Sequence, residues 1–223
     1  MPEEVPPSLR ISSWVQAPPP SGQRTAWHRL AAGMRAVNEA LMDMDASEAD
    51  LEAAAEALHQ FAENLEKTRT GHQHWGFGES APAGTTRAMM DRSPIVGLGN
   101  PVAPPLVFGV EGDQVVGRGR FGLQYEGPPN SVHGGFVAAA LDELLGMAQS
   151  LSGKAGMTGT LTVRYRKPTP LHTDLTLTAR VEKVEGRKIF TSGEVRAGDM
   201  LCAEAEGIFI SVDFQAVFAQ TSS

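Results

Sequence analysis

The spacing of apolar residues predicts a helical N-terminal part. Between Trp27 and Leu41, and again between Leu51 and Leu65, apolar residues recur every three or four positions, which indicates two amphipathic helices. Ser47-Glu-Ala-Asp50 is a capping box at the start of the second helix. The two helices should form an antiparallel hairpin with facing apolar stripes. Because such a hairpin is unstable alone, we expect it to pack on the rest of the chain or on a partner subunit.

From Leu106 onward the period changes to two, which predicts β-strands. Glycine-containing turns at Gly112, Gly186 and Gly198 separate several of them. The stretch from Gly117 to Gly122 spells GxGxxG, but strand pattern rather than a helix follows it, so we interpret it as a twisted strand and not as a dinucleotide site. The predicted strands cover residues 106–110, 115–124, 159–167, 174–184, 188–196 and 201–212.

Residues 130–146 interrupt the strands with a nearly unbroken apolar helix. Gly134 and Gly135 stand in its first turn, and Asp142 lies in its apolar middle. Peptide N–H groups at a helix start attract developing negative charge, and a buried carboxylate can act as a base or a nucleophile. Together they predict chemistry on a carbonyl. A sheet that curls around this helix would explain why it is apolar nearly all round.

Composition narrows the class of protein. The net charge of −7 disfavours a nucleic-acid partner, and residues 1–70 hold 6 Arg/Lys against 11 Asp/Glu, which argues against a DNA-binding helix-turn-helix. The single cysteine, Cys202, leaves no disulfide within one chain and fits a reducing compartment. No apolar run approaches the length of a membrane span. We therefore expect a cytoplasmic protein with no membrane span.

The same patterns predict the domain organisation and no metal site. We expect an extended arm and helical hairpin over residues 1–70, a linker or wrapping loop over 71–99, a main domain over 100–214 and a tail over 215–223. His72 and His74 are spaced like half of a metal site, but no nearby Cys, Asp or Glu completes a set of ligands, so we interpret them as loop residues.

Separated motifs agree with one known family. His133-Gly134-Gly135, an aspartate nine residues further on, and the run from Met157 to Leu171 (MTGTLTVRYRKPTPL) together resemble the hotdog-fold acyl-CoA thioesterases. The likeness is to the phenylacetate-pathway type and to its mitochondrial long-chain acyl-CoA relatives, and it covers about residues 100–214. It implies an α+β hotdog fold, with an antiparallel sheet wrapped around a long central helix, to which the N-terminal helical hairpin is added. It also implies an acyl-CoA substrate, with coenzyme A as part of that substrate and no separate cofactor.

The resemblance assigns roles to residues of this sequence. Asp142 would be the general base or nucleophile, a backbone N–H of Gly134 or Gly135 would polarise the thioester carbonyl, and Thr158 would help to hold the water. His133 is either a base or a residue that caps or supports the helix start, and we favour the second role. Some branches have Asn six residues before this His, where the chain has Gly127; Asn130 lies only three before it. The predicted substrate-binding residues are Asn130, Arg164, Arg166, Arg187, Lys188, Ile189, Phe190, Thr191 and Ser192.

Helix geometry predicts a dimer. Nine residues along an α-helix advance about 13 Å and turn through roughly 900°, which leaves the two ends half a revolution apart, so the helix start and Asp142 of one chain should lie apart and on opposite sides. A two-fold dimer brings the helix start of one chain to the carboxylate of the other. We expect a homodimer, and relatives suggest a dimer of dimers. Glu143 is a competing carboxylate, but it points in another direction around the helix.

Two alternatives to an acyl-CoA hydrolase are considered. The first is a non-catalytic acyl-CoA sensor or scaffold of the same fold, and the second is a hotdog hydratase or dehydratase. The second pairs an acidic residue with a catalytic histidine in a pattern that this chain lacks.

Overall fold

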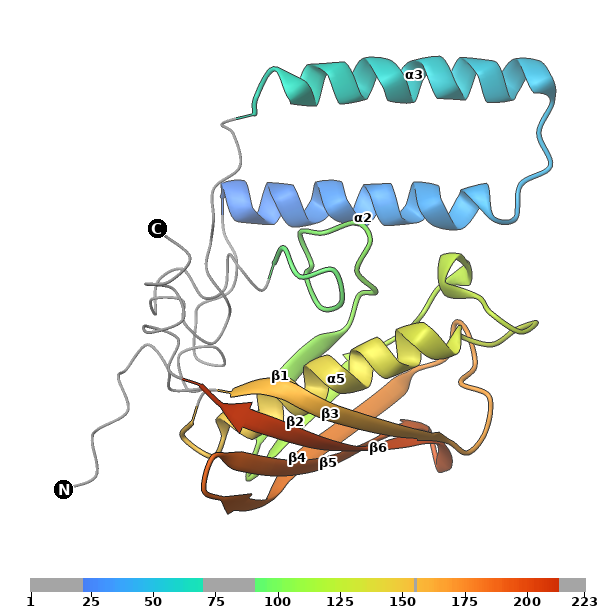
Figure 1. Ribbon diagram of the computed structural model, residues 1–223. Coiled ribbons are helices and arrows are strands. Elements are labelled where there is room, and N and C mark those ends of the chain that lie inside the picture. The colour runs from blue at the N-terminus through green and yellow to red at the C-terminus, as the bar shows by residue number, and fades with distance from the viewer. Residues whose placement is uncertain (1–21, 70–90, 155, 213–223) are drawn as a thin grey trace.

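The computed structural model of the chain describes residues 22–69, 91–154 and 156–212. The predicted extended arm before Gly22, the pair His72 and His74, and the C-terminal tail lie outside the described residues. The described part contains two N-terminal helices, a central helix and one sheet (Figure 1).

The sheet has six strands in the order β1-β2-β4-β5-β6-β3, and all its neighbouring strands are antiparallel. The strand β3 follows the central helix in sequence but pairs only with β6, so it forms one edge of the sheet. Positive φ angles at Gly112, Gly186 and Gly198 confirm the predicted hairpin turns. The strands are β1 (Val107–Glu111), β2 (Gln114–Gly119), β3 (Gly156–Tyr165), β4 (Leu175–Glu185), β5 (Lys188–Ala197) and β6 (Met200–Ser211).

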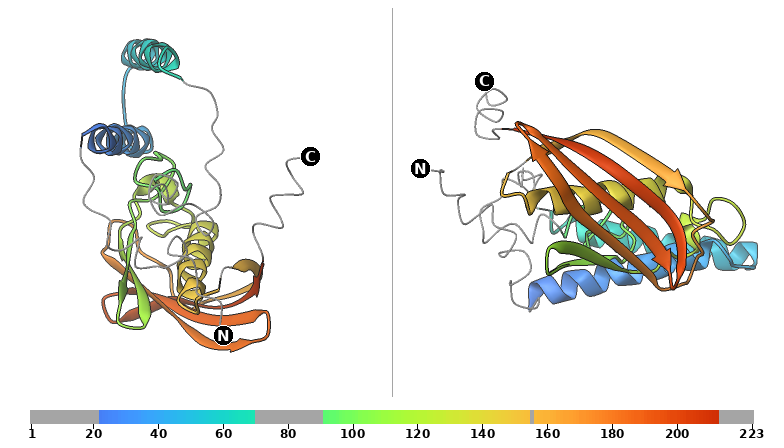
Figure 2. Two further views of the ribbon diagram at one scale, coloured as in Figure 1. Left: turned by 90° about the vertical axis from the view of Figure 1, so that its left-hand side faces the viewer. Right: turned by 90° about the horizontal axis from the view of Figure 1, so that it is seen from below.

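The central helix α5 (Gly134–Ser150) lies across one face of the curved sheet (Figures 1 and 2). Leu141, Leu144 and Leu145 are fully buried between the helix and the strands. Inward-facing strand residues such as Leu177 and Val195 complete the core. This arrangement confirms the predicted hotdog architecture, in which a sheet curls around one apolar helix.

Several predicted boundaries differ from those in the structure, and two of the differences have a clear physical reason. Helix α5 begins at Gly134 and not at residue 130, because residues 127–132 form a turn that closes with a hydrogen bond from the N–H of Gly127 to the carbonyl of Ser131. Strand β2 ends at Gly119, and a short 3-10 helix, η2 (Leu123–Tyr125), follows it. The glycine run is part of a strand, as expected. A Cβ at Gly117 would lie only 2.3 Å from Cε1 of Phe108, so a larger residue there would have to displace that ring.

The helix α2 (Gln23–Leu41) is anchored near both of its ends to later parts of the chain. Near its start, Arg24 Nη2 donates to Asp91 at 2.9 Å, and His28 Nε2 lies 2.9 Å from the same carboxylate. Near its end, Glu39 accepts a hydrogen bond from the N–H of Leu123 at 2.8 Å. Asp91 is itself buried, so this N-terminal helix is part of the fold and not an appendage.

The helix α3 (Glu48–Glu66) begins at the predicted cap, where Ser47 Oγ accepts a hydrogen bond from the N–H of Asp50. It runs antiparallel to α2 on the side away from the sheet (Figure 1). The expected facing apolar stripes are not found, because α3 buries none of its residues. Its four large apolar residues stay 37% to 41% exposed: Leu51, Leu58, Phe61 and Leu65. The connection of six residues between the two helices is also longer than the predicted three or four.

Candidate active site

The start of α5 presents one unused peptide N–H. His133 is the N-cap, and its Nδ1 accepts a hydrogen bond from the N–H of Gly135 at 3.0 Å. The next two N–H groups donate to the carbonyl of His133. Among the described residues, none accepts a hydrogen bond from the N–H of Gly134. The predicted capping role of His133 is therefore confirmed, and of the two glycines only Gly134 offers a free donor at the positive end of the helix.

Asp142 is half-buried in the third turn of α5 and faces the strand β3. Thr158 Oγ1 donates a hydrogen bond to Asp142 Oδ1 at 2.9 Å. This bond fixes one carboxylate oxygen and leaves the other without a partner among the described residues. A carboxylate that is oriented in this way can accept a proton from water or attack an electrophile directly.

The two parts of the site contact the same strand. Thr158, near the start of β3, holds Asp142, whereas Tyr165, at its end, donates a hydrogen bond from its hydroxyl to the carbonyl of Gly134 at 2.8 Å. The expectation that the helix start and Asp142 lie on opposite sides of the helix was therefore wrong. They are separated along the axis instead, by about 12 Å for eight helical residues. Tyr165 was not identified from the sequence, because only the packing of β3 on α5 brings its hydroxyl to the helix start.

The turn before α5 explains the missing asparagine. A Cβ at Gly127 would lie 2.7 Å from Cα of His133, so a larger residue at this position would displace the residue that caps the helix. Asn130 adopts a positive φ of 57° and accepts a hydrogen bond at its carbonyl from the N–H of Leu171. Its side chain is exposed on the same turn.

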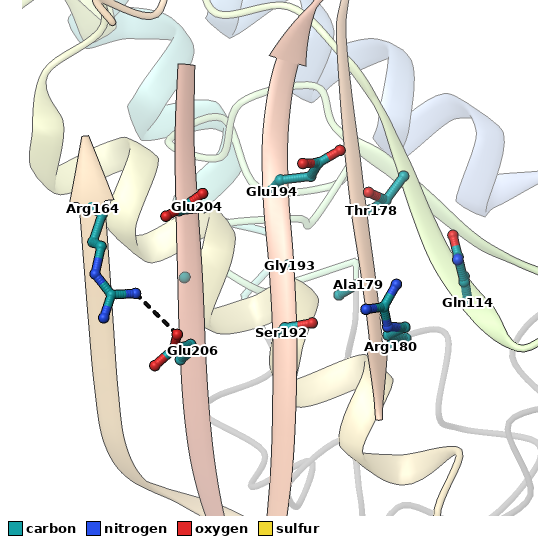
Figure 3. A pocket seen from close by; sticks show the side chains of 11 residues that line it. Gln114, Arg164, Thr178, Ala179, Arg180, Ser192, Gly193, Glu194, Glu204 and Glu206 are labelled. Carbon is teal, nitrogen blue, oxygen red and sulfur yellow. Dashed lines mark hydrogen bonds and ion pairs between the residues drawn. The ribbon is translucent and has the colours of Figure 1, made fainter. Parts of the chain in front are cut away.

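The two strand arginines lie away from Asp142. Arg164 points to the outer face of the sheet, where it pairs with Glu206 at 3.0 Å (Figure 3). Arg166 pairs with Glu204. A hollow of about 550 Å³ lies on this outer face, and neither Asp142 nor Gly134 lines it. It is lined by Gln114, Arg164, Thr178, Ala179, Arg180, Ser192, Gly193, Glu194, Glu204, Ala205 and Glu206.

The segment from Arg187 to Ser192 alternates between the surface and the core. Arg187 and Lys188 are exposed at the hairpin between β4 and β5, whereas Ile189 and Thr191 are buried in the core. Ser192 donates a hydrogen bond to Glu182, and this bond holds the pKa of that carboxyl below its usual value. Lys183 Nζ lies 4.6 Å from the centre of the Phe190 ring. Of this segment, therefore, only Arg187 and Lys188 present charge to an outside ligand, and the assignment of all six residues stays a prediction.

The described residues contain neither a group of metal ligands nor a membrane-spanning helix. No three His, Cys, Asp or Glu side chains among residues 22–69, 91–154 and 156–212 are grouped so that they could hold a metal ion. No helix in the same part of the chain is both long and apolar enough to cross a membrane.

Comparison with known proteins places these features in a family. The profile of the Thioesterase superfamily matches residues 129–204, which include Asp142, Thr158 and the glycine turn, that is, Gly134 and Gly135 in the first turn of α5. The acyl-coenzyme A thioesterase THEM4 of Xenopus laevis is 41% identical over 93 residues, and that of Bos taurus is 38% identical over 94 residues. Each match covers 41% of this chain and 42% or 38% of the relative, so the chain matches only about two fifths of the length of these curated relatives.

A solved structure matches nearly the whole described chain. The crystal structure of RHA08564, a thioesterase superfamily protein, is 37% identical with a TM-score of 0.74, and the match covers 87% of this chain and 97% of that one. The resemblance drawn from the sequence motifs is thereby confirmed. The chain belongs to the thioesterase superfamily.

Proposed function

We propose that this protein hydrolyses acyl-CoA thioesters to a free acid and coenzyme A. The observation that carries the proposal is the hydrogen bond from Thr158 to Asp142, which orients a half-buried carboxylate on the central helix. The names of the THEM4 relatives, which match over this part of the chain, supply the substrate class. A thioester is already activated, so a base and an oxyanion donor suffice for its hydrolysis.

In the proposed mechanism, Asp142 either removes a proton from the water that attacks the carbonyl carbon, or attacks that carbon itself to form a mixed anhydride that water then hydrolyses. In both cases the C–S bond breaks, and coenzyme A leaves as a thiolate that takes up a proton. The hydroxyl of Thr158 holds the carboxylate and, with it, the water. The N–H of Gly134 donates to the carbonyl oxygen as negative charge develops there. One such donor lowers the barrier by about 2.7–4 kcal/mol, and a positioned base contributes roughly 10²–10⁴-fold in rate.

The mechanism requires two copies of the chain. Gly134 and Asp142 of one chain are separated by about 12 Å along the helix, which is too far for both to reach one carbonyl group. The strand β3 has a neighbour on one side only, and its open edge carries the exposed apolar side chains of Met157 and Tyr165. An unpaired edge of this kind can bind another strand. We therefore propose that β3 pairs antiparallel with β3 of a second copy.

Two-fold pairing explains how a complete site forms. Antiparallel pairing of a strand with its own copy brings the end of one strand beside the start of the other. The end of β3 that contacts Gly134 would then lie next to the start of β3 in the partner subunit, which holds the partner's Asp142. Each dimer would have two equivalent sites, and two dimers can assemble further into a tetramer.

Binding of coenzyme A is proposed to involve exposed cations. Its phosphates favour Arg and Lys. Arg187 and Lys188 are exposed at the tip of the hairpin, whereas Arg164 and Arg166 are already paired with glutamates and would have to share their charge. We also propose a cytoplasmic location. The free thiol of Cys202 is compatible with it, since burial raises the pKa of this thiol and keeps it protonated.

Thiol release from a panel of acyl-CoAs tests the proposal. Wild-type protein should release coenzyme A, and Asp142→Asn should lose turnover but keep its thermal stability and its binding of acyl-CoA. Asn has nearly the same shape as Asp but can neither accept the proton nor attack the carbonyl. An active Asp142→Asn variant would overturn the assigned role of Asp142. Binding without any thiol release by the wild type would instead favour an acyl-CoA sensor or scaffold.

A further inference from the structure

Tyr165 is the side chain that contacts Gly134, the residue whose N–H is the free donor in the first turn of α5. Its hydroxyl donates to the carbonyl of Gly134 at 2.8 Å. A Cβ built on Gly134 would have three nearest neighbours, and all of them are atoms of Tyr165: Cζ and Oη at 3.4 Å and Cε1 at 3.5 Å. Apart from its chain neighbours and the backbone of its own helix, no other described residue comes closer to that Cβ position. Tyr165 therefore fixes the residue whose N–H is unused.

The glycine turn needs such an external contact. Each glycine in a helix costs roughly 0.5–1 kcal/mol relative to alanine, because its backbone has the most freedom to lose. Two glycines in succession make the first turn of α5 the part of the helix whose orientation is least fixed by its own sequence. The carbonyl and the N–H of Gly134 are joined through only two soft dihedral angles, so a bond that holds the carbonyl also restricts the direction of the N–H.

The direction of this N–H matters for the reaction proposed above. An oxyanion donor is effective when it lies about 2.7–3.1 Å from the position that the oxyanion will occupy. A misplacement of about 1 Å can lower the rate by roughly a hundredfold. Thr158 holds Asp142 from the other end of the same strand. One strand thus orients the carboxylate of its own chain and the oxyanion donor of its own chain.

We propose that Tyr165 is a positioning residue for the N–H of Gly134. This inference rests on the proposed function for its catalytic consequence, but the structural part can be tested without any activity. A purely stabilising role is a poor explanation, because one neutral hydrogen bond of this kind adds only about 0.5–1.5 kcal/mol to stability.

The chain supplies a matched control. It contains two tyrosines, and each donates its hydroxyl to a backbone carbonyl. The hydroxyl of Tyr125 bonds to the carbonyl of Val102 at 3.0 Å, within the core. Tyr125→Phe and Tyr165→Phe therefore remove the same chemical group and the same type of bond, one in the core and one at the glycine turn.

The first experiment measures steady-state kinetics and thermal stability. Tyr165→Phe should lower kcat by about 3- to 10-fold, as expected for one lost neutral hydrogen bond, with little change in KM or Tm. Tyr125→Phe should lower Tm and leave kcat unchanged. In a Gly134→Pro background, which has no N–H to position, Tyr165→Phe should cause no further loss. An unchanged kcat, a rise in KM alone, or an additive double variant would each overturn the proposal.

The second experiment uses hydrogen exchange and is independent of turnover. The amides of Gly135, Phe136 and Val137 should exchange faster in Tyr165→Phe than in the wild type, while those in the middle of α5 should not change. Equal exchange in the first turn would overturn the proposal even if the enzyme is active. If the wild type hydrolyses no thioester, the proposed function fails, but faster exchange would still establish that Tyr165 holds this turn.

Discussion

The free N–H of Gly134 can be removed with one substitution that the backbone tolerates. Gly134 is the first residue of α5, and the residue before it, His133, has φ −58° and ψ 131°. Proline is favoured at the first position of a helix, and it requires an extended residue before it, as is found here. Gly134→Pro should therefore preserve the helix start while it deletes the donor.

The expected loss follows from the value of one oxyanion donor. A contribution of about 2.7–4 kcal/mol corresponds to a fall in kcat of roughly 10²–10³-fold. The N–H of Gly134 makes no hydrogen bond with any described residue, so its removal should cost little stability. Binding of acyl-CoA should be nearly unchanged, because the interaction develops mainly in the transition state.

The assay is continuous thiol release, with Gly134→Ala as the control. Alanine keeps the N–H, and its Cβ would meet Tyr165 at 3.4 Å, which is an ordinary contact. Gly134→Ala should therefore retain at least about a tenth of the activity, since a small shift costs far less than a lost donor. If Gly134→Pro folds normally and keeps wild-type kcat, the assignment of the oxyanion donor is wrong.

Three further predictions test the dimer, the N-terminal helix and the buried tyrosine. The Asp142→Asn and Gly134→Pro variants, each inactive alone, can be combined in a purified heterodimer. This heterodimer should regain about half of the wild-type activity, because two-fold symmetry leaves one of its two sites with both residues intact. If each site lies within one chain, no activity returns. Asp91→Asn should lower the free energy of unfolding by about 3 kcal/mol in urea denaturation, because it breaks a largely buried pair with Arg24. A change below about 0.5 kcal/mol, which is typical of surface substitutions, would show that this pair does not anchor α2. Burial raises the pKa of Tyr125 to about 12, so the folded state keeps a proton that the unfolded state loses near pH 10. The free energy of unfolding should then be fully present below pH 10 and fall as the pH rises toward 12, and Tyr125→Phe should remove this part of the decline.

The exposed stripe on α3 shows where local sequence reasoning was incomplete. Its apolar period and its Ser47 cap correctly predicted the helix, because both depend on residues within a few positions of each other. The predicted burial against α2 did not follow, since an amphipathic pattern shows that a face can be buried but not which surface covers it. The same limit applies to the residues after Arg187, where alternation predicted a strand but not that Ile189 would face the core.

The sequence by itself predicted the six strands and three helices of the described part of the chain, and it singled out Asp142 and the pair Gly134-Gly135, which the proposed chemistry uses. Glycines beside a helix start and a carboxylate in an apolar helix are local features, and their unusual cost makes them visible without a structure. Only the tertiary structure decided that Gly134 and not Gly135 has the free N–H, because this depends on the ring of His133. It also placed β3 at the edge of the sheet and thereby brought Thr158 and Tyr165 to the two parts of the site. These contacts join residues 16 and 31 positions apart, and no local pattern encodes them, because they form only when the strand packs on the helix.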